Sequence, residues 1–159
     1  MLGAVSAFAL GPLVPIDGTL HSGGYIKLLE KFFKPFMERA QGQSDQKLRW
    51  LQDHASIHES HFSECLMKTW GWELAEHPVR SPDLNCIEFV WLVVMSLIRQ
   101  RRPRSRHDLL CALDEFWPLA ADPSQFHHYL AAMEQNVLQV VEKKGGNHYQ
   151  ENRFRKAIM

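Results

Sequence analysis

The first twenty residues are mostly apolar and are interrupted twice by turn-forming residues. Residues 2–10 and 13–16 form two apolar runs separated by Gly11 and Pro12, and a second turn signal follows at residues 17–18. Short apolar runs bounded by glycine and proline are typical of strands. We therefore expect two short strands joined by a tight turn.

The next elements alternate between helical and extended patterns. Apolar positions at spacings of three and four after residue 22 predict a helix that Ser22 caps. The alternating run at residues 47–52 predicts a short strand that ends at Asp53 and lies at the centre of a sheet. A second helical pattern and another short strand are expected at residues 59–70 and 72–75.

The sharpest helical pattern begins at Asn85, a favourable N-cap residue. Its apolar face consists of Ile87, Val90, Trp91, Val94 and Ile98. Pro103 follows the pattern and is expected to stop the helix. Residues 107–117 and 125–143 predict two further amphipathic helices, the second ended by Gly145 and Gly146.

Strands that alternate with helices, followed by helices alone, indicate an α/β layer fold. The 159 residues suffice for one domain with a buried core, which we place at residues 1–150 with a C-terminal tail at 151–159. Lys plus Arg and Asp plus Glu both number 18, which argues against a uniformly basic surface but allows a local basic patch. An apolar content of 45% argues against intrinsic disorder.

The cysteine and hydropathy patterns indicate in which cellular compartment the protein is expected. Cys65, Cys86 and Cys111 show no Cys-x-x-Cys spacing, which favours a reducing compartment over a disulfide scaffold. No apolar run approaches the roughly 20 residues that a membrane helix needs. The apolar N-terminal segment has no positively charged region and is broken at Gly11, which argues against a signal peptide.

Two acidic residues occupy positions suited to metal-dependent chemistry. Asp53 ends a predicted strand and Glu88 lies in the first turn of a predicted helix, with the 34 residues 54–87 between them. Carboxylates that meet at one edge of a sheet can bind a hard divalent cation, and such ions serve phosphoryl transfer. On spacing alone, a capping-box role for Glu88 with Asn85 is favoured, and Asp53 could be a plain turn acid.

The segments around both acids resemble motifs of the mariner/Tc-type DDE transposases. DHASIH at residues 53–58 is similar to the second acidic motif of that family, Asp-Asn-Ala-Pro-x-His. SPDLNCIEFVW at residues 81–91 is similar to the third, Ser-Pro-Asp-Leu-Asn-Pro-Ile-Glu-x-x-Trp. The gap between the acids is the spacing of one major branch. LGPLVPIDGTL at 10–20 and EKKGGNHY at 142–149 also resemble the family, so the likeness covers nearly the whole chain.

The resemblance implies an RNase H-like fold, a mixed sheet with flanking helices. In that family, catalytic acids bind two Mg²⁺ ions, which activate water to nick DNA and then activate the freed 3′-hydroxyl to attack target DNA. Asp53 matches the second acid and Glu88 the third, so both are expected to be catalytic and metal-binding. Other matched positions that shape the site are His58, Ser81, Pro82, Asp83, Asn85 and Trp91.

The chain also departs from the family pattern, and these departures lead to further expectations about its activity. The family's first acid lies on a strand that precedes the segment matching residues 1–20, so the first strand and its acid are expected to be missing. Asp17 falls at a turn between later elements and cannot replace it. Loss of one essential ligand typically removes most of the rate. We therefore expect an N-terminally truncated and inactive catalytic domain related to DNA transposition and DNA integration.

A cluster of histidines permits a different metal hypothesis. Spacings of 4, 3 and 4 separate His54, His58, His61 and Cys65, which on a single helix would give one zinc-binding face. The family match places residues 54–58 at a strand-to-helix junction, which favours a loop and an exposed helix face instead.

Five arginines follow the helix that carries Glu88, and they predict phosphate contacts with DNA. They are Arg99, Arg101, Arg102, Arg104 and Arg106. The alternative is a solvated loop around Pro103.

DNA is the expected partner, and an unpaired strand edge suggests a homo-oligomer or a complex with a full-length transposase copy. A nuclear location is expected because the family that the chain resembles occurs in eukaryotes. Two alternatives stay open at this point. One is a non-catalytic nucleic-acid-binding protein derived from a transposable element, and the other is a gene model whose true start lies upstream.

Overall fold

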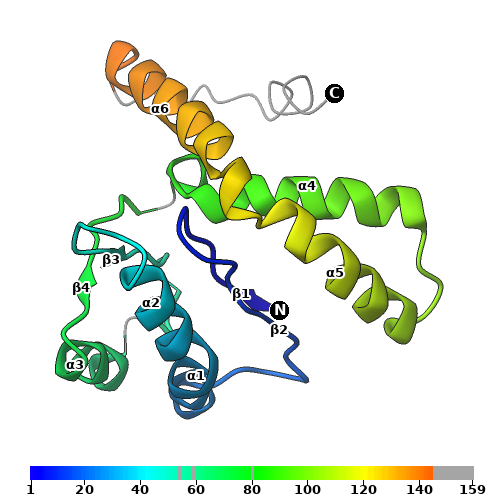
Figure 1. Cartoon of the computed structure of the whole chain (residues 1–159), viewed down its shortest axis with the longest axis horizontal. Helices are drawn as coiled ribbons and strands as arrows, with labels where there is room; N and C mark the ends of the chain where they lie inside the picture. The colour runs from blue at the N-terminus through cyan, green and yellow to red at the C-terminus, as the bar shows by residue number, and fades with distance from the viewer. Residues whose placement is uncertain (54, 59, 80, 145–159) are drawn as a thin grey trace.

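The computed structural model describes residues 1–53, 55–58, 60–79 and 81–144, which form a mixed α/β structure made mostly of helix (Figure 1). The glycines expected to stop the last helix, the tail at 151–159 and His54 lie outside these residues. Within the described ranges, no helix is long and apolar enough to cross a membrane.

Among the described residues, the strands form two separate two-stranded sheets instead of the single mixed sheet expected. They are β1 (Leu2–Gly3), β2 (Leu13–Val14), β3 (Arg49–Trp50) and β4 (Glu73–Leu74). β1 and β2 are antiparallel, whereas β3 and β4 are parallel. The expectation of a central strand at residues 47–52 is wrong for the described chain, because β3 pairs only with β4 there.

The connection between β1 and β2 is a loop of residues 4–12, so the expected tight turn is wrong. The N–H of Ala4 donates to the carbonyl of Pro12 at 3.1 Å and closes the base of this loop. Further along, the indole Nε1 of Trp117 donates to the carbonyl of Gly11 at 2.8 Å. The loop is therefore held by a helix more than one hundred residues away.

A continuous helical segment carries the aromatic residues of the first half of the chain. It comprises α1 (Ser22–Leu28), the π-helical η1 (Leu29–Phe33) and α2 (Lys34–Gln41). In the π-helical part, the N–H of Lys34 donates to the carbonyl of Leu29, five residues back. Pro35 follows directly and has no N–H with which to continue α-helical bonding.

The expected capping role of Ser22 is wrong. Ser22 is the first helical residue of α1, and His21 holds the N-cap position without a side-chain hydrogen bond. By contrast, α3 (His61–Thr69) begins at a true cap, because the hydroxyl of Ser60 accepts from the N–H of Ser63 at 3.2 Å.

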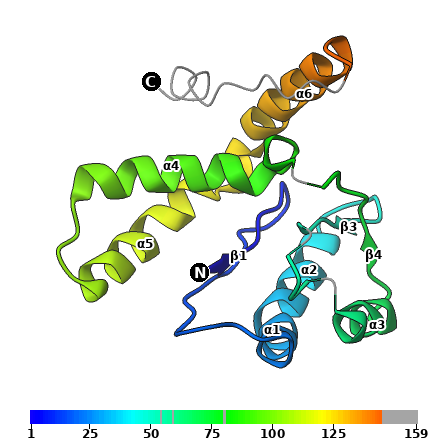
Figure 2. The ribbon, with the colours of Figure 1, turned by 180° about the vertical axis from the view of Figure 1, so that it is seen from behind.

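The second half of the chain is helical, as the hydrophobic pattern predicts. Its elements are η2 (Pro82–Leu84), α4 (Cys86–Arg101), α5 (Arg106–Ala120), η3 (Pro123–Gln125) and α6 (Phe126–Glu142). Arg102 ends α4 in a left-handed conformation with φ of 52°, just before Pro103. Figures 1 and 2 show α4 and α5 side by side, with α6 extending away from them.

Two clusters of buried hydrophobic residues lie among these helices and strands. One lies against α1, η1 and α2, and its fully buried members include Leu29, Phe33 and Phe36. The other lies between α4 and α5 and includes Val90 and Trp117. The β1–β2 segment lies between the two helical groups (Figures 1 and 2).

The β1–β2 segment approaches α5 so closely that a side chain at residue 3 would not fit. A Cβ at Gly3 would lie 2.7 Å from the ring of Trp117 and 3.2 Å from the ring of Trp91. Glycine is therefore required at this position by the contact between β1 and the two indole rings.

Candidate active site

A pocket of about 540 Å³ opens between β1, the α1–α2 helices, the end of β3 and the start of α4. Asp53 and Glu88 both line it, together with His58 and Asn85. The structure thus brings to one pocket the two acids that the sequence singles out, although they come from separate elements.

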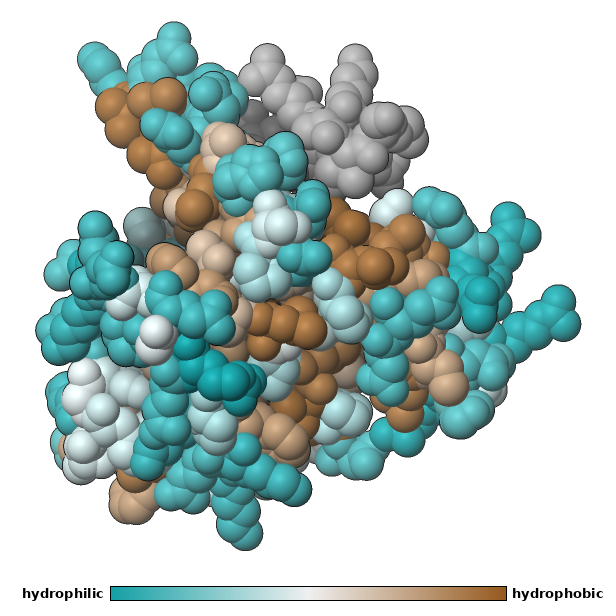
Figure 3. Space-filling model, in the orientation of Figure 1, coloured by the Kyte–Doolittle hydropathy of each residue, from teal (hydrophilic) through white to brown (hydrophobic). Residues whose placement is uncertain are grey.

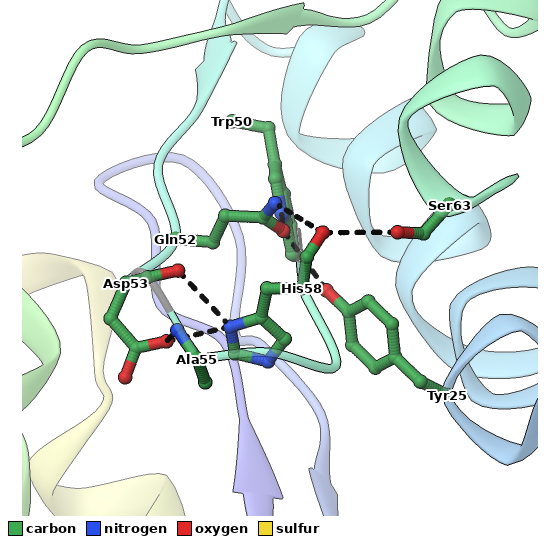
Figure 4. A network of polar contacts seen from close by, with 7 residues as sticks. All are labelled: Tyr25, Trp50, Gln52, Asp53, Ala55, His58 and Ser63. Atoms are coloured by element: carbon green, nitrogen blue, oxygen red, sulfur yellow. Dashed lines mark hydrogen bonds and ion pairs between the residues drawn. The ribbon is translucent and has the colours of Figure 1, made fainter. Parts of the chain in front are cut away.

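Asp53 is held by the loop that precedes α3. Its side chain is 59% exposed, and β3 ends at Trp50, so the expectation that the strand continues to Asp53 is wrong. Its Oδ1 atom lies 2.6 Å from Nδ1 of His58, and the same oxygen accepts from the N–H of Ala55 at 3.2 Å (Figure 4). His58 is only 12% exposed, so the more buried partner positions the more exposed one.

A network of hydrogen bonds fixes the main chain on both sides of Asp53 (Figure 4). The side-chain oxygen of Gln52 accepts from the hydroxyl of Tyr25 at 3.0 Å and from the indole of Trp50 at 3.1 Å. The carbonyl of His58 accepts from Gln52 Nε2 at 3.3 Å and from the hydroxyl of Ser63 at 3.0 Å. Burial raises the pKa of the Tyr25 hydroxyl far above its usual range, so this hydroxyl remains a donor.

These positioning residues were missed by sequence reasoning. Gln52 directly precedes Asp53, and Tyr25 lies on the predicted helical face, where an aromatic residue indicates packing and nothing more specific. Only the tertiary structure shows that the Tyr25 hydroxyl reaches Gln52 and that the rings of Tyr25 and His58 lie 4.7 Å apart.

Glu88 occupies the third position of α4. The side chain of Asn85 caps the helix by accepting from the N–H of Ile87 at 3.3 Å. The N–H of Asn85 donates to the carbonyl of Pro82 at 3.1 Å, which takes the role that Glu88 would fill in a capping box. The capping-box interpretation of Glu88 is therefore wrong, and its carboxylate lines the pocket instead.

The environment of Glu88 disfavours its charged form. Its pKa is raised above the ordinary value of 4.5, first because burial removes water from the carboxylate and second because the negative charge of Asp53 lies nearby. A cation between the two carboxylates would relieve both effects. Repulsion between a partly buried carboxylate and a second carboxylate nearby is typical of sites that bind metal ions or protons.

The raised pKa of Glu88 predicts a pH-dependent cost to stability. Because the folded state holds the proton more tightly, the favourable contribution is complete below pH 4.5 and is lost as the pH rises through the folded pKa. Glu88→Gln removes this loss, so the variant should gain stability over wild type as the pH rises to 7. Urea unfolding at a series of pH values measures the difference.

Glu134→Gln provides a matched control, because it makes the same chemical change at an exposed position on α6. We expect its difference from wild type to stay constant with pH. A Glu88→Gln difference that is equally constant would contradict the effect of burial and of Asp53 on Glu88.

No group of three or more histidine, cysteine or acidic side chains that could hold a metal ion is found among the described residues. The zinc hypothesis requires these residues to lie on one face of a single helix. Instead, His58 lies in the loop beside Asp53, while His61 and Cys65 lie on α3. Sγ of Cys65 lies 3.5 Å from Nε2 of His61, which is a pair of groups and not a set of ligands.

The five arginines lie at the opposite end of α4 from Glu88. All are exposed. At 1.5 Å per residue, Arg99 is about 16 Å along the helix axis from Glu88. Arg106 is paired with Asp17, and Arg101 lies 3.7 Å from Glu115, so carboxylates already neutralise two of the five.

The comparisons with known proteins agree with the motifs. No family model matches the chain. It is 24% identical over 132 residues to the transposable element Tc3 transposase of Caenorhabditis elegans, which covers 82% of this chain and 39% of the transposase. The chain is thus similar in sequence to Tc-type transposases.

Two further Tc-type transposases, Tcb1 and Tcb2 of Caenorhabditis briggsae, are each 26% identical to this chain, over 145 and 143 residues. Each match covers 90% of this chain and 51% of the transposase. The chain therefore spans about half or less of the length of these curated Tc-type relatives.

Proposed function

We propose that this transposase relative is a transposon-derived catalytic-domain segment, related to DNA transposition and DNA integration, in which Asp53 and Glu88 bind one Mg²⁺ ion. The observation that carries the proposal is that both residues line one pocket, where burial and, second to it, the charge of Asp53 raise the pKa of Glu88. The motif positions of both acids support the same assignment.

We also propose that the fold is a partial RNase H-like domain. The antiparallel β1–β2 pair, the parallel β3–β4 pair and helices on both sides are compatible with parts of one mixed sheet. The position of the pocket between the two pairs supports this assignment.

The donor set fits Mg²⁺, which prefers oxygen ligands and is commonly held by one or two carboxylates together with water or phosphate oxygens. When bound, the ion would supply Lewis-acid activation of oxygen and stabilise charge on a phosphoryl group. His58 would orient Asp53 through its 2.6 Å contact. Two carboxylates are too few for the two-ion site of the family, so we propose that the 159-residue chain alone does not cleave DNA.

Mg²⁺ binding is tested by thermal or chemical unfolding of the whole chain. At ten times its dissociation constant, Mg²⁺ should stabilise the folded state by about 1.4 kcal/mol. Asp53→Asn and Glu88→Gln should each remove most of this increment, whereas Glu134→Gln should leave it unchanged. Equal stabilisation of Glu88→Gln and wild type would show that Mg²⁺ binds elsewhere.

Catalytic inactivity is tested by incubating supercoiled plasmid with the chain and Mg²⁺. We expect nicking at the background rate for wild type and for Glu88→Gln. Mg²⁺-dependent cleavage that Glu88→Gln abolishes would overturn the proposed inactivity and would support a complete site.

A second candidate is nucleic-acid binding without cleavage, and the exposed arginines at the α4–α5 connection favour it. Duplex DNA rises about 3.4 Å per base pair, so a short stretch could extend from these arginines to the acidic pocket. The names of the nematode relatives, all transposases of transposable elements, support DNA as the partner. A nuclear location is part of the same proposal and rests on the resemblance of the motifs alone.

A further inference from the structure

One side of α6 packs against the segment that leads into α4. Sγ of Cys86, the first residue of α4, lies 3.4 Å from Sδ of Met133. Nδ2 of Asn136 donates to the carbonyl of Asp83 at 3.0 Å. Residues three positions apart lie on the same side of a helix, so Met133 and Asn136 together hold the segment from residue 83 to residue 86 against α6. This segment includes the cap of α4 and leads to Glu88.

The burial of Asn136 reverses the pattern expected of a surface helix. Among the residues of α6, all of which the structure describes, Asn136 alone is buried, with a relative exposure of 8%. Val137, Leu138 and Val141 are exposed instead, and apolar side chains gather along α6 in the space-filling view (Figure 3). Packing alone favours the opposite arrangement, because burial of an amide costs free energy unless the amide forms hydrogen bonds. The bond to Asp83 therefore accounts for an asparagine at this position.

The bond from Asn136 belongs to a set of hydrogen bonds that links α6 to the main chain of Glu88. Asn136 fixes the carbonyl of Asp83. The neighbouring carbonyl of Pro82 accepts from the N–H of Asn85 at 3.1 Å, and the carbonyl of Asn85 accepts from the N–H of Glu88, also at 3.1 Å. A movement of the turn at η2 would therefore displace the cap of α4 and, with it, Glu88.

A second hydrogen bond of the same kind fixes α6 at a different place. The hydroxyl of Tyr129 donates to the carbonyl of Ala120, the last residue of α5, at 2.8 Å. Helix α6 is thus bonded to α5 through Tyr129 and to η2 through Asn136. Both bonds are partly buried and join an α6 side chain to a main-chain carbonyl, so the loss of either should loosen α6 by a similar amount. The bond of Asn136 differs because its acceptor lies in the turn before Glu88.

We infer that Asn136 is a positioning residue, which holds the turn at η2 against α6 and thereby directs the side chain of Glu88 into the pocket. Asn136 acts through the main chain of this turn, whereas Glu88 itself lines the pocket. The inference deepens the proposed function and rests on it, because Glu88 is one of the two proposed Mg²⁺ ligands. It adds α6, which no motif of the sequence singles out, to the parts of the chain that shape the site.

Asn136→Leu tests the inference, because leucine has a similar size and cannot donate to Asp83. We expect the amides of Asn85 and Glu88 to exchange their hydrogens about fivefold faster than in wild type, measured by nuclear magnetic resonance without denaturant. The Mg²⁺ affinity of the folded protein, measured by calorimetric titration, should fall about threefold or more. Asn136→Ala removes the donor without adding bulk and should give the same two results, also where Asn136→Leu does not fold.

Tyr129→Phe is the matched control, since it removes the bond from α6 to Ala120 and keeps the aromatic ring. Its free energy of unfolding should fall by an amount similar to that of Asn136→Leu. A residue that only stabilises α6 would affect the site no more than Tyr129 does. We therefore expect wild-type exchange at Asn85 and Glu88 and wild-type Mg²⁺ affinity for Tyr129→Phe.

Amide exchange at the wild-type rate in both Asn136 variants would overturn the inference. Equal acceleration in Tyr129→Phe would overturn it as well, because the effect would then come from a general loosening of α6. Where wild type binds Mg²⁺, an unchanged affinity in both Asn136 variants would have the same consequence. A wild-type chain that does not bind Mg²⁺ would contradict the proposed function instead, and the exchange of Asn85 and Glu88, which requires no metal, would still decide the role of Asn136.

Discussion

Trp117→Ala should lower the free energy of unfolding by about 4 kcal/mol, the cost typical of removing a large aromatic side chain from a core. Trp117 is only 4% exposed and packs with α4 residues in the second hydrophobic cluster. Its ring centroid lies 5.1 Å from that of Trp91, and its Nε1 donates to the carbonyl of Gly11 at 2.8 Å. The substitution therefore removes packing and a buried hydrogen bond together.

Trp117→Phe separates these two contributions. It keeps an aromatic ring near Trp91 and loses the donor to Gly11, so a smaller loss is expected, with about 1 kcal/mol due to the hydrogen bond. Urea unfolding followed by circular dichroism measures both variants. A loss below about 1 kcal/mol for Trp117→Ala would show that the contact between α5 and the β1–β2 loop contributes little to stability.

Replacing Arg99, Arg102 and Arg104 together with glutamine should weaken DNA binding and reduce its salt dependence. Each phosphate contact contributes a slope of about 0.9 to the plot of log affinity against log salt, so three lost contacts lower the slope by about 2.7. These three are chosen because Arg101 and Arg106 already lie near Glu115 and Asp17. Fluorescence anisotropy with labelled duplex DNA over a salt series measures the slope.

The control carries the same charge change on the other side of the molecule. Lys27, Arg39 and Lys68 are exposed on α1, α2 and α3, and their replacement with glutamine should leave most of the slope unchanged. Similar losses in both triple variants would indicate general attraction to a polyanion. A wild-type affinity that does not vary with salt would exclude phosphate contacts at the α4–α5 connection.

The elements that rest on local signals could be predicted from the sequence. Asn85, the apolar face of α4 and Pro103 are local features, and α4 begins and ends where they indicate. Ser22 shows the limit of such signals, because a serine next to a helix start is a frequent cap and is not one here. The central position of β3 was also wrong, because strand pairing depends on distant segments that a local pattern does not report.

The candidate site likewise combines features that could be predicted from the sequence with features that only the structure shows. Asp53 and Glu88 could be singled out from their motifs, and the meeting of both at one pocket follows the expectation. The exposure of Asp53 and the bonding of Gln52 to Tyr25 could not be predicted, because both depend on how the loop before α3 packs against α1. Glu88 required the structure as well, since only the bond from Asn85 to Pro82 excludes its capping-box role.

The wide helical turn at η1 links the first hydrophobic cluster to the acidic pocket. If this turn tightened into regular α-helix, α2 would rotate relative to α1 by up to about 100°, the angular step of one residue. Tyr25 and Phe36 could then no longer both keep their present contacts, and the hydroxyl that holds Gln52 would shift. A substitution near Pro35 can thus misalign Asp53 without altering any residue that touches it.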